Sequence, residues 1–540
     1  MRDLIQNNSP CAKEKSHYPT DRKDFIFALL MFVCTFLFVD GVFWGWFNLG
    51  LSVAFLLTWI AASCYLHRRD VKIGAYPILC GILFAGMTPI FFLTSNFPVR
   101  ILSAGTMVLL SCVWFCALAG KKIPGGDLGL LAMWGGIFAN TFRDTVPAVR
   151  SVFSAKGEKK KKILCALAGA LCALPVLAVV IPLLIRSDAA FEGLTAGLFA
   201  SLGTRFFQLL ATVFLALFCF GCIFSIRKRK ADDRRCVSAK GAEPVFWAVC
   251  TGALCVLYIV YLFSQLAYFF SAFSGILPDG YVFSYAEYAR RGFFELCGIA
   301  AINLAMLVLM LLFSKKKDGK LPVILRVHGT FLGVFTLLLI ATSLSKMWMY
   351  IRNYSLTVLR LGTSAFLMFM AVVFVTGILR CYTDRVQIFQ TALITASVIL
   401  LLLGLGNINS MVARYNYNDY VQKGYRTIDV QYLSSFPEGI AYLEKLMDTD
   451  GVRTAAEDAL QGTFYSVCKT DDWGEEIQYD DNGDFIPGKA CTLSSSFNLA
   501  YRNAFSILQK YAETHPEFRP RSLYESEEET TETTVSWECD

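Results

Sequence analysis

Charged side chains are scarce in this chain of 540 residues. Asp, Glu, Lys and Arg together make up 17% of it, whereas hydrophobic residues make up 55%. A soluble domain carries about 25% charged residues, and the mean hydropathy here is +0.49. This composition excludes an ordinary soluble domain and a disordered chain, and it indicates a membrane protein.

Motifs for catalysis are also missing. The chain has 4 histidines, and no two of them stand at the spacing of metal ligands. The zinc metalloprotease pattern, the phosphate-binding loop of nucleotide hydrolases and the nucleophile elbow are absent. We expect no metal, no cofactor and no nucleic-acid partner, and an enzyme is less favoured than a non-enzyme.

Long apolar runs are abundant instead. Each has about 20 residues, enough for an α-helix to cross a hydrocarbon core of about 30 Å. The runs are continuous rather than alternating, which predicts helices and not a barrel. The predicted fold is an all-α polytopic membrane protein with about eleven transmembrane helices, at 24–40, 46–66, 74–93, 101–119, 162–185, 205–226, 245–271, 292–313, 321–345, 357–379 and 387–406.

The basic residues predict the orientation. With the N-terminus inside, the inner segments hold 31 Lys and Arg residues and the outer loops hold seven. Lys and Arg concentrate in the cytoplasmic loops of membrane proteins. We therefore predict a multi-pass protein whose N-terminus is cytoplasmic and whose C-terminal domain is extracytoplasmic.

Four regions follow from these spans. They are a cytoplasmic N-terminal segment (1–23), the transmembrane helical domain (24–406), a small and mostly helical extracytoplasmic domain (407–522) and an acidic disordered tail (523–540).

Within the C-terminal domain, a polar helix is expected to run straight on from the last span. Further helices are predicted at 437–447 and 496–511, with a turn-rich region at 463–493 in which β structure is an alternative. Cys468 and Cys491 both fall in this domain, and whether they form a disulfide stays open.

Four stretches are predicted to meet the membrane surface. Residues 128–143 suit a helix lying in the inner interface, and 187–203 its counterpart outside. The Lys-rich run 156–162 and the Lys/Arg run 227–230 are inner. These basic runs either serve only to fix the orientation of the helices in the membrane, or they bind anionic lipid as well. Membrane lipids, anionic at these inner loops, are the expected partners.

A charged, tyrosine-containing motif stands at the outer mouth of the span 292–313. It contains Tyr285, Tyr288, Arg290 and Arg291, and Glu295 follows about one turn into the apolar run. An isolated carboxylate at that depth is costly, so a partner is expected. Arg360 lies at a similar depth from the same side, and we predict a structural ion pair between Glu295 and Arg360.

Other outer segments add cations and tyrosines to the same face. The segment before the span 357–379 carries Lys346, Tyr350, Arg352 and Tyr354, and Arg414 follows the last span. Guanidinium and ammonium groups suit phosphate or carboxylate, and tyrosines suit the headgroup level. These residues, with the motif at 285–291, form the predicted ligand-binding cluster. Arg290 and Arg352 have few acidic neighbours, so we expect them to point into a tyrosine-lined cleft.

Three motifs resemble a known family. "YAEYARRGFFEL", "MYIRNYSLTVLRL" and "ARYNYNDY…IDVQYLSS" are similar to motifs of the bacterial membrane family called domain of unknown function 4173 and of its relative 4153, over roughly residues 25–440. The resemblance implies a polytopic protein of the bacterial cell membrane and envelope, and it implies no particular activity. Relatives carry an acidic residue where this chain has Arg352, so no acid–base role is implied there.

Three classes of function stay open. The outer cluster binds an anionic lipid-linked or envelope ligand, for sensing, envelope assembly or transport. Alternatively, the charges are purely structural and lock the outer segments into a cap. The third class is a membrane-embedded glycosyl or phosphoryl transferase with Asp40, Glu287 or Glu295 as base.

Overall fold

The computed structural model describes most of the transmembrane region and most of the C-terminal helices. The described residues are 21–43, 45, 47–124, 126–153, 169, 173, 180, 189–228, 241–274, 293–316, 320–423, 428–449, 451–468, 490–492 and 494–515. Within these ranges the chain is α-helical and contains no β-strand, and an isolated bridge joins Ala242 and Ser314. The predicted all-α class is confirmed for this part of the chain.

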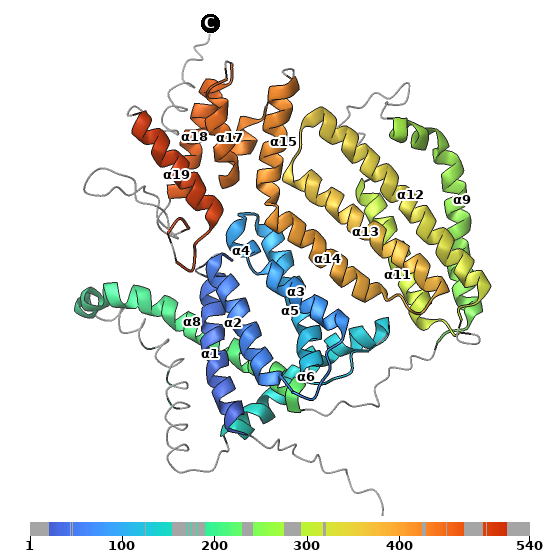
Figure 1. Cartoon of the computed structure of the whole chain (residues 1–540), viewed down its shortest axis with the longest axis horizontal. Helices are drawn as coiled ribbons and strands as arrows, with labels where there is room; N and C mark the ends of the chain where they lie inside the picture. The colour runs from blue at the N-terminus through green and yellow to red at the C-terminus, as the bar shows by residue number, and fades with distance from the viewer. Residues whose placement is uncertain are drawn as a thin grey trace, which may run out of the picture.

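The helices fall into a transmembrane group and a C-terminal group (Figure 1). The first group is α1 (Arg22–Phe43), α2 (Leu49–Leu66), α3 (Ala75–Met87), α4 (Ile90–Leu93), α5 (Phe97–Leu118), α6 (Asp127–Phe153), α8 (Ala189–Lys228), α9 (Pro244–Ser274), α11 (Phe293–Phe313), α12 (Val323–Tyr354), α13 (Val358–Tyr382) and α14 (Ile388–Leu405). The second is α15 (Ile408–Lys423), α16 (Val430–Ser434), η1 (Pro437–Gly439), α17 (Ile440–Leu446), α18 (Arg453–Cys468) and α19 (Leu499–Thr514).

Nine helices of the described residues are long and apolar enough to cross a membrane. Each overlaps one of the predicted spans, so a multi-pass membrane protein is confirmed. A tenth predicted span, 292–313, is the helix α11, whose described apolar part is the shorter Gly298–Phe313. The predicted span 162–185 lies almost wholly outside the described residues, so the count of eleven stays a prediction.

The transmembrane bundle has two distinct ends. We call the end that carries α15–α19 the C-domain face (Figure 1). There the backbone N–H of Leu49 donates to the carbonyl of Phe497 over 3.1 Å. At the opposite face, the start of α1 meets the end of α8 through Asp24 and Lys228. The end of α13 meets the end of α11 there as well, through Asp384 and Lys316.

A proline breaks the third span and shapes the C-domain face. Pro89 has no N–H and cannot donate to the carbonyl of Ala85, so the helix stops there. The hydroxyl of Thr88 donates to that carbonyl instead, over 2.8 Å. The short helix α4 and the turn 94–96 follow, and this turn supplies several of the polar groups described below.

Two expectations about the C-terminal helices were wrong. The helix after the last span does not run straight, because Asn407 adopts a left-handed φ of 50° and separates α14 from α15. Asn is one of the few residues that tolerate this conformation. Residues 463–468 are helical as the end of α18, where a turn-rich or β region was expected. The apolar face of α18 explains the helix, since Ala456 and Leu460 are buried in the core of the C-terminal helices.

Helices were predicted correctly on either side of α18. The range 437–447 is η1 and α17, and 496–511 overlaps α19. Residues 128–143 fall within α6, which is not among the membrane-crossing helices, and the described part of 187–203 belongs to the long helix α8.

Candidate functional site

Part of the predicted cluster lies outside the described residues. This applies to Tyr285, Tyr288, Arg290 and Arg291, and to the side chain of Glu295. Their roles, the cleft beneath Arg290 and Arg352, and the Glu295–Arg360 pair therefore stay predictions. The other members come from α12, α13 and α15 at the C-domain face.

Arg360 binds the end of the helix that precedes it. Its guanidinium donates to the carbonyl of Tyr354 over 2.8 Å and also to that of Ser355. These two carbonyls lie where α12 has ended, and cations are favourable beside such groups. The same guanidinium stacks on Tyr350, 3.9 Å from the ring centre, and Tyr350 meets Tyr354 edge to face. Arg360 and both tyrosines thus hold the α12–α13 turn together.

The C-terminal helices hold the same turn from the other side. Asn416 of α15 accepts from the N–H of Leu356 and donates to its carbonyl, both over 2.8 Å. The hydroxyl of Tyr432 in α16 accepts from the N–H of Val358 over 2.7 Å. A buried backbone group without a partner is costly. The side chains of Asn416 and Tyr432 therefore stabilise the turn by supplying its backbone groups with hydrogen-bond partners.

The remaining cations of the cluster differ from Arg360. Arg352 and Arg414 are exposed, and neither has a hydrogen bond or an ion pair with another described residue. Lys346 is half-buried and does take part in an interaction. The cluster therefore divides into a structural part around Arg360 and an accessible basic part formed by Arg352 and Arg414.

A small apolar slot lies below this cluster, between α11, α12 and α13. Its volume is about 20 Å³, and it is lined by Leu296, Ala300, Leu339, Ile340, Ser343, Phe366, Leu367 and Met370. Lys346 is three residues after Ser343, and Arg360 is seven before Leu367. At these spacings each cation continues a helix stripe that lines the slot. With a rise of about 1.5 Å per residue, Lys346 stands about 5 Å along α12 from Ser343, and Arg360 stands about 10 Å along α13 from Leu367.

The sequence analysis missed a second polar site, where the C-terminal helices dock on the bundle. Asn498, the N-cap of α19, is fully buried. Its amide donates to Oδ1 of Asn48 over 3.1 Å and to the carbonyl of Thr94 over 3.0 Å. Asn48 in turn donates to the carbonyl of Ser496 over 2.8 Å and accepts from the buried Arg100.

An adjoining part of this docking site is centred on a carboxylate. Glu438 of η1 accepts from the backbone N–H of Ser95 over 2.9 Å and from its hydroxyl over 2.7 Å. Asn409 of α15 donates to the same carboxylate over 3.1 Å, and Asn96 donates to Asn409 over 3.0 Å. The sequence hints at this docking site only through asparagines near the ends of several spans. Asparagine is too common in loops for this pattern to predict an interface.

The opposite face contains an ion-paired site of its own. Asp24 is fully buried, 3.0 Å from Nζ of Lys228 and 3.5 Å from Arg227, and it accepts from the hydroxyl of Tyr65 over 2.7 Å. Arg227 also lies over the ring of Tyr65, 4.2 Å from its centre. The described half of the basic run 227–230 is thus engaged by a carboxylate, and the Lys-rich run 156–162 lies outside the described residues.

Comparison with known proteins gives a family and no activity. Among the described residues no three His, Cys, Asp or Glu side chains gather closely enough to hold a metal ion. No curated protein and no solved structure matches the chain. The motifs resemble two related families, 4173 and 4153. A family match is found for 4153, and membership of 4173 is not shown. The family described as domain of unknown function (DUF4153) matches residues 25–446, most of the chain, and this protein belongs to that family.

Proposed function

We propose that this protein binds an anionic, lipid-linked ligand at its C-domain face, and that this face is extracytoplasmic. The ligand's chain packs against the apolar surface at the slot between α11, α12 and α13, and its phosphate meets the cations above. Sensing, envelope assembly and transport at a bacterial plasma membrane are the roles that such binding serves.

One observation carries the proposal: the apolar slot and the cations lie on the same helix stripes. Leu339, Ile340 and Ser343 line the slot from α12, and Lys346 follows on that side of the helix. An amphiphile suits this combination, because its chain packs favourably against apolar side chains and its phosphate requires donors. Exposed Arg352 adds a donor that no described residue occupies.

The charge distribution supports the orientation. Lys315, Lys316, Lys320 and Arg326 all stand where α11 ends and α12 begins, at the opposite face. The alternation of the described helices is consistent with the predicted inner and outer loops. Basic loops favour the cytoplasm, so the C-domain face is assigned to the outside.

A structural cap is the second candidate, and a specific observation favours it. Arg360, Asn416 and Tyr432 all bind backbone groups of the α12–α13 turn. In this account the outer charges join the C-terminal helices to the bundle without a ligand. The two accounts differ in what Lys346 and the slot do.

The test uses the full-length protein in phosphatidylcholine nanodiscs, titrated with a polyprenyl phosphate and followed by native mass spectrometry. Lys346→Gln removes a cation above the slot, and Ala300→Leu fills the slot. Each should weaken binding by roughly tenfold, the equivalent of one charge-assisted contact. Ala301→Leu is the matched control, because Ala301 is the next residue and is exposed.

Unfolding temperatures separate binding from folding. Ala300→Leu and Lys346→Gln must unfold within a few degrees of the unmodified protein for the comparison to hold. Lys346→Arg keeps the charge and should retain binding. Equal binding by the unmodified protein, Lys346→Gln and Ala300→Leu would leave the structural cap as the better account.

A further inference from the structure

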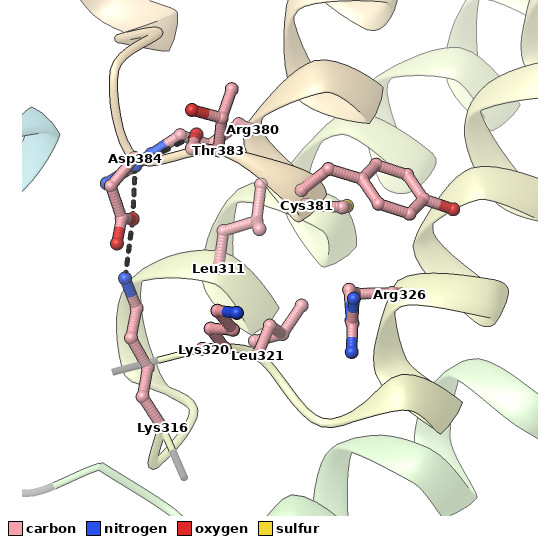
Figure 2. A pocket seen from close by; sticks show the side chains of 10 residues that line it. Leu311, Lys316, Lys320, Leu321, Arg326, Arg380, Cys381, Thr383 and Asp384 are labelled. Atoms are coloured by element: carbon pink, nitrogen blue, oxygen red, sulfur yellow. Dashed lines mark hydrogen bonds and ion pairs between the residues drawn. The ribbon is translucent and has the colours of Figure 1, made fainter. Parts of the chain in front are cut away.

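A second pocket lies at the opposite face, between the end of α11, the start of α12 and the end of α13. Its volume is about 40 Å³, and the described residues that line it include Lys316, Lys320, Arg326, Arg380 and one carboxylate, that of Asp384. Figure 2 shows the pair Lys316–Asp384 on one side of the pocket and Arg326 on the other. We propose that this pocket binds the phosphate group of an anionic ligand.

Two of the four cations are already paired. Nζ of Lys316 lies 2.7 Å from the carboxylate of Asp384. Arg380 pairs with Asp384 as well, and its Nε lies 3.5 Å from the carboxylate of Asp127 outside the pocket. These contacts hold the two side chains in place, so the ends of α11 and α13 form a fixed wall.

The other two cations are available to a ligand. Nε of Arg326 is buried and has no hydrogen-bond partner among the described residues. Lys320 is exposed, and it forms no ion pair within the described ranges. A buried guanidinium nitrogen without an acceptor is costly. An incoming oxyanion supplies that acceptor, and among the described residues four cations against the carboxylates of Asp384 and Asp127 leave this region positive.

The size and the position of the pocket define the ligand. Roughly 10–15 Å³ holds one water molecule, so 40 Å³ admits a group of a few heavy atoms such as a phosphate. Arginine binds phosphate through two parallel donors. Arg326 stands in the first turn of α12, where the helix dipole also favours an anion. Because α12 enters the membrane here, a phospholipid headgroup or a free phosphate could supply the group.

The test uses the full-length protein and the double variant Lys320→Gln, Arg326→Gln. One arm measures, by native mass spectrometry, the phosphatidylglycerol retained from nanodiscs of equal parts phosphatidylglycerol and phosphatidylcholine. The other arm measures the rise in unfolding temperature with inorganic phosphate, against sodium chloride of equal ionic strength. The matched control is Arg385→Gln, which removes an exposed cation of the same face outside the pocket.

We expect the double variant to bind roughly tenfold more weakly and Arg385→Gln to bind normally. A loss confined to phosphatidylglycerol identifies a headgroup site, and a loss with inorganic phosphate identifies a site for free phosphate. If the double variant does not fold, Lys320→Gln alone must show the loss, since Lys320 is exposed. Unchanged binding of both probes by a folded variant would overturn the proposal, and it would leave the slot at the C-domain face untouched.

Discussion

The side-chain amide of Asn498 donates to the side-chain oxygen of Asn48 over 3.1 Å, although 450 positions separate the two residues. Asn48 lies just before α2, and Asn498 begins α19, so this bond joins the last described helix to the first helix pair. Arg100 donates to the same oxygen of Asn48. The C-terminal helices are therefore fastened to the bundle by buried polar groups.

Replacing Asn498 with alanine should loosen this docking. The change removes the N-cap of α19, whose Oδ1 accepts from the N–H of Ala500, and it leaves the carbonyl of Thr94 without a donor. We expect a loss of about 2–4 kcal/mol in the free energy of unfolding. Denaturant unfolding measures it, with Asn503→Ala on the exposed side of the same helix as control. Equal losses from the two variants would contradict the buried network.

Charge reversal at Arg360 should cost more than charge reversal at Glu295. Arg360→Glu loses the carbonyls of Tyr354 and Ser355 in addition to any partner carboxylate. Breaking a buried ion pair costs about 3–5 kcal/mol. The double variant Glu295→Arg, Arg360→Glu should recover only part of the combined loss, because glutamate cannot donate to those carbonyls. Strictly additive losses, measured by thermal unfolding in detergent, would show that the two residues are not partners.

Gly41 should not tolerate a side chain. A Cβ at this position would stand 2.6 Å from the backbone nitrogen of Leu51, so α1 and α2 would have to separate. We expect Gly41→Ala to lower the free energy of unfolding by about 1–3 kcal/mol. Gly105→Ala is the control, because nothing lies within 4 Å of a Cβ there and alanine is the better helix former. A neutral Gly41→Ala would show that the first two helices do not approach so closely.

Asp384 should stabilise the fold in a pH-dependent way. Its hydrogen bond from Lys316 holds the pKa of the carboxyl below its usual value. Because the folded pKa is lowered, the stabilisation is present above the unfolded pKa of about 3.9 and is lost as the pH falls through the folded pKa. Unfolding temperatures of the unmodified protein and Asp384→Asn should therefore differ at neutral pH and converge below about pH 4. The difference is small, because the pair is largely exposed. A gap that stays constant down to pH 3 would contradict this assignment.

Reporter fusions test the orientation. Fusions near residues 230 and 316 should report the cytoplasm, and fusions near 285, 350 and 470 should report the outside. The reason is the excess of Lys and Arg in the loops assigned to the inside. A cytoplasmic signal at 470 would mean an even number of crossings, and the slot would then face the cell interior.

The sequence by itself determined the class of the protein and the positions of most of its spans. The apolar runs have lengths that match the bilayer, and burial in lipid depends on each segment separately. The run 357–379, for example, corresponds to α13 (Val358–Tyr382) without any knowledge of its neighbours. The predicted helix at 496–511 also follows from local periodicity, because the buried residues Ala500, Ala504 and Leu508 of α19 recur every four positions.

The tertiary structure decided which polar groups meet. Arg360 meets tyrosine and backbone carbonyl partners that no pattern in the sequence indicated, and its pairing with Glu295 stays a prediction. Asn48 and Asn498 are ordinary loop residues until the chain brings α2 and α19 together. Hydrogen bonds have short range and strict direction, so partners depend on how distant segments pack. Hydrophobic burial has neither constraint, and that is why the spans could be predicted and the polar sites could not.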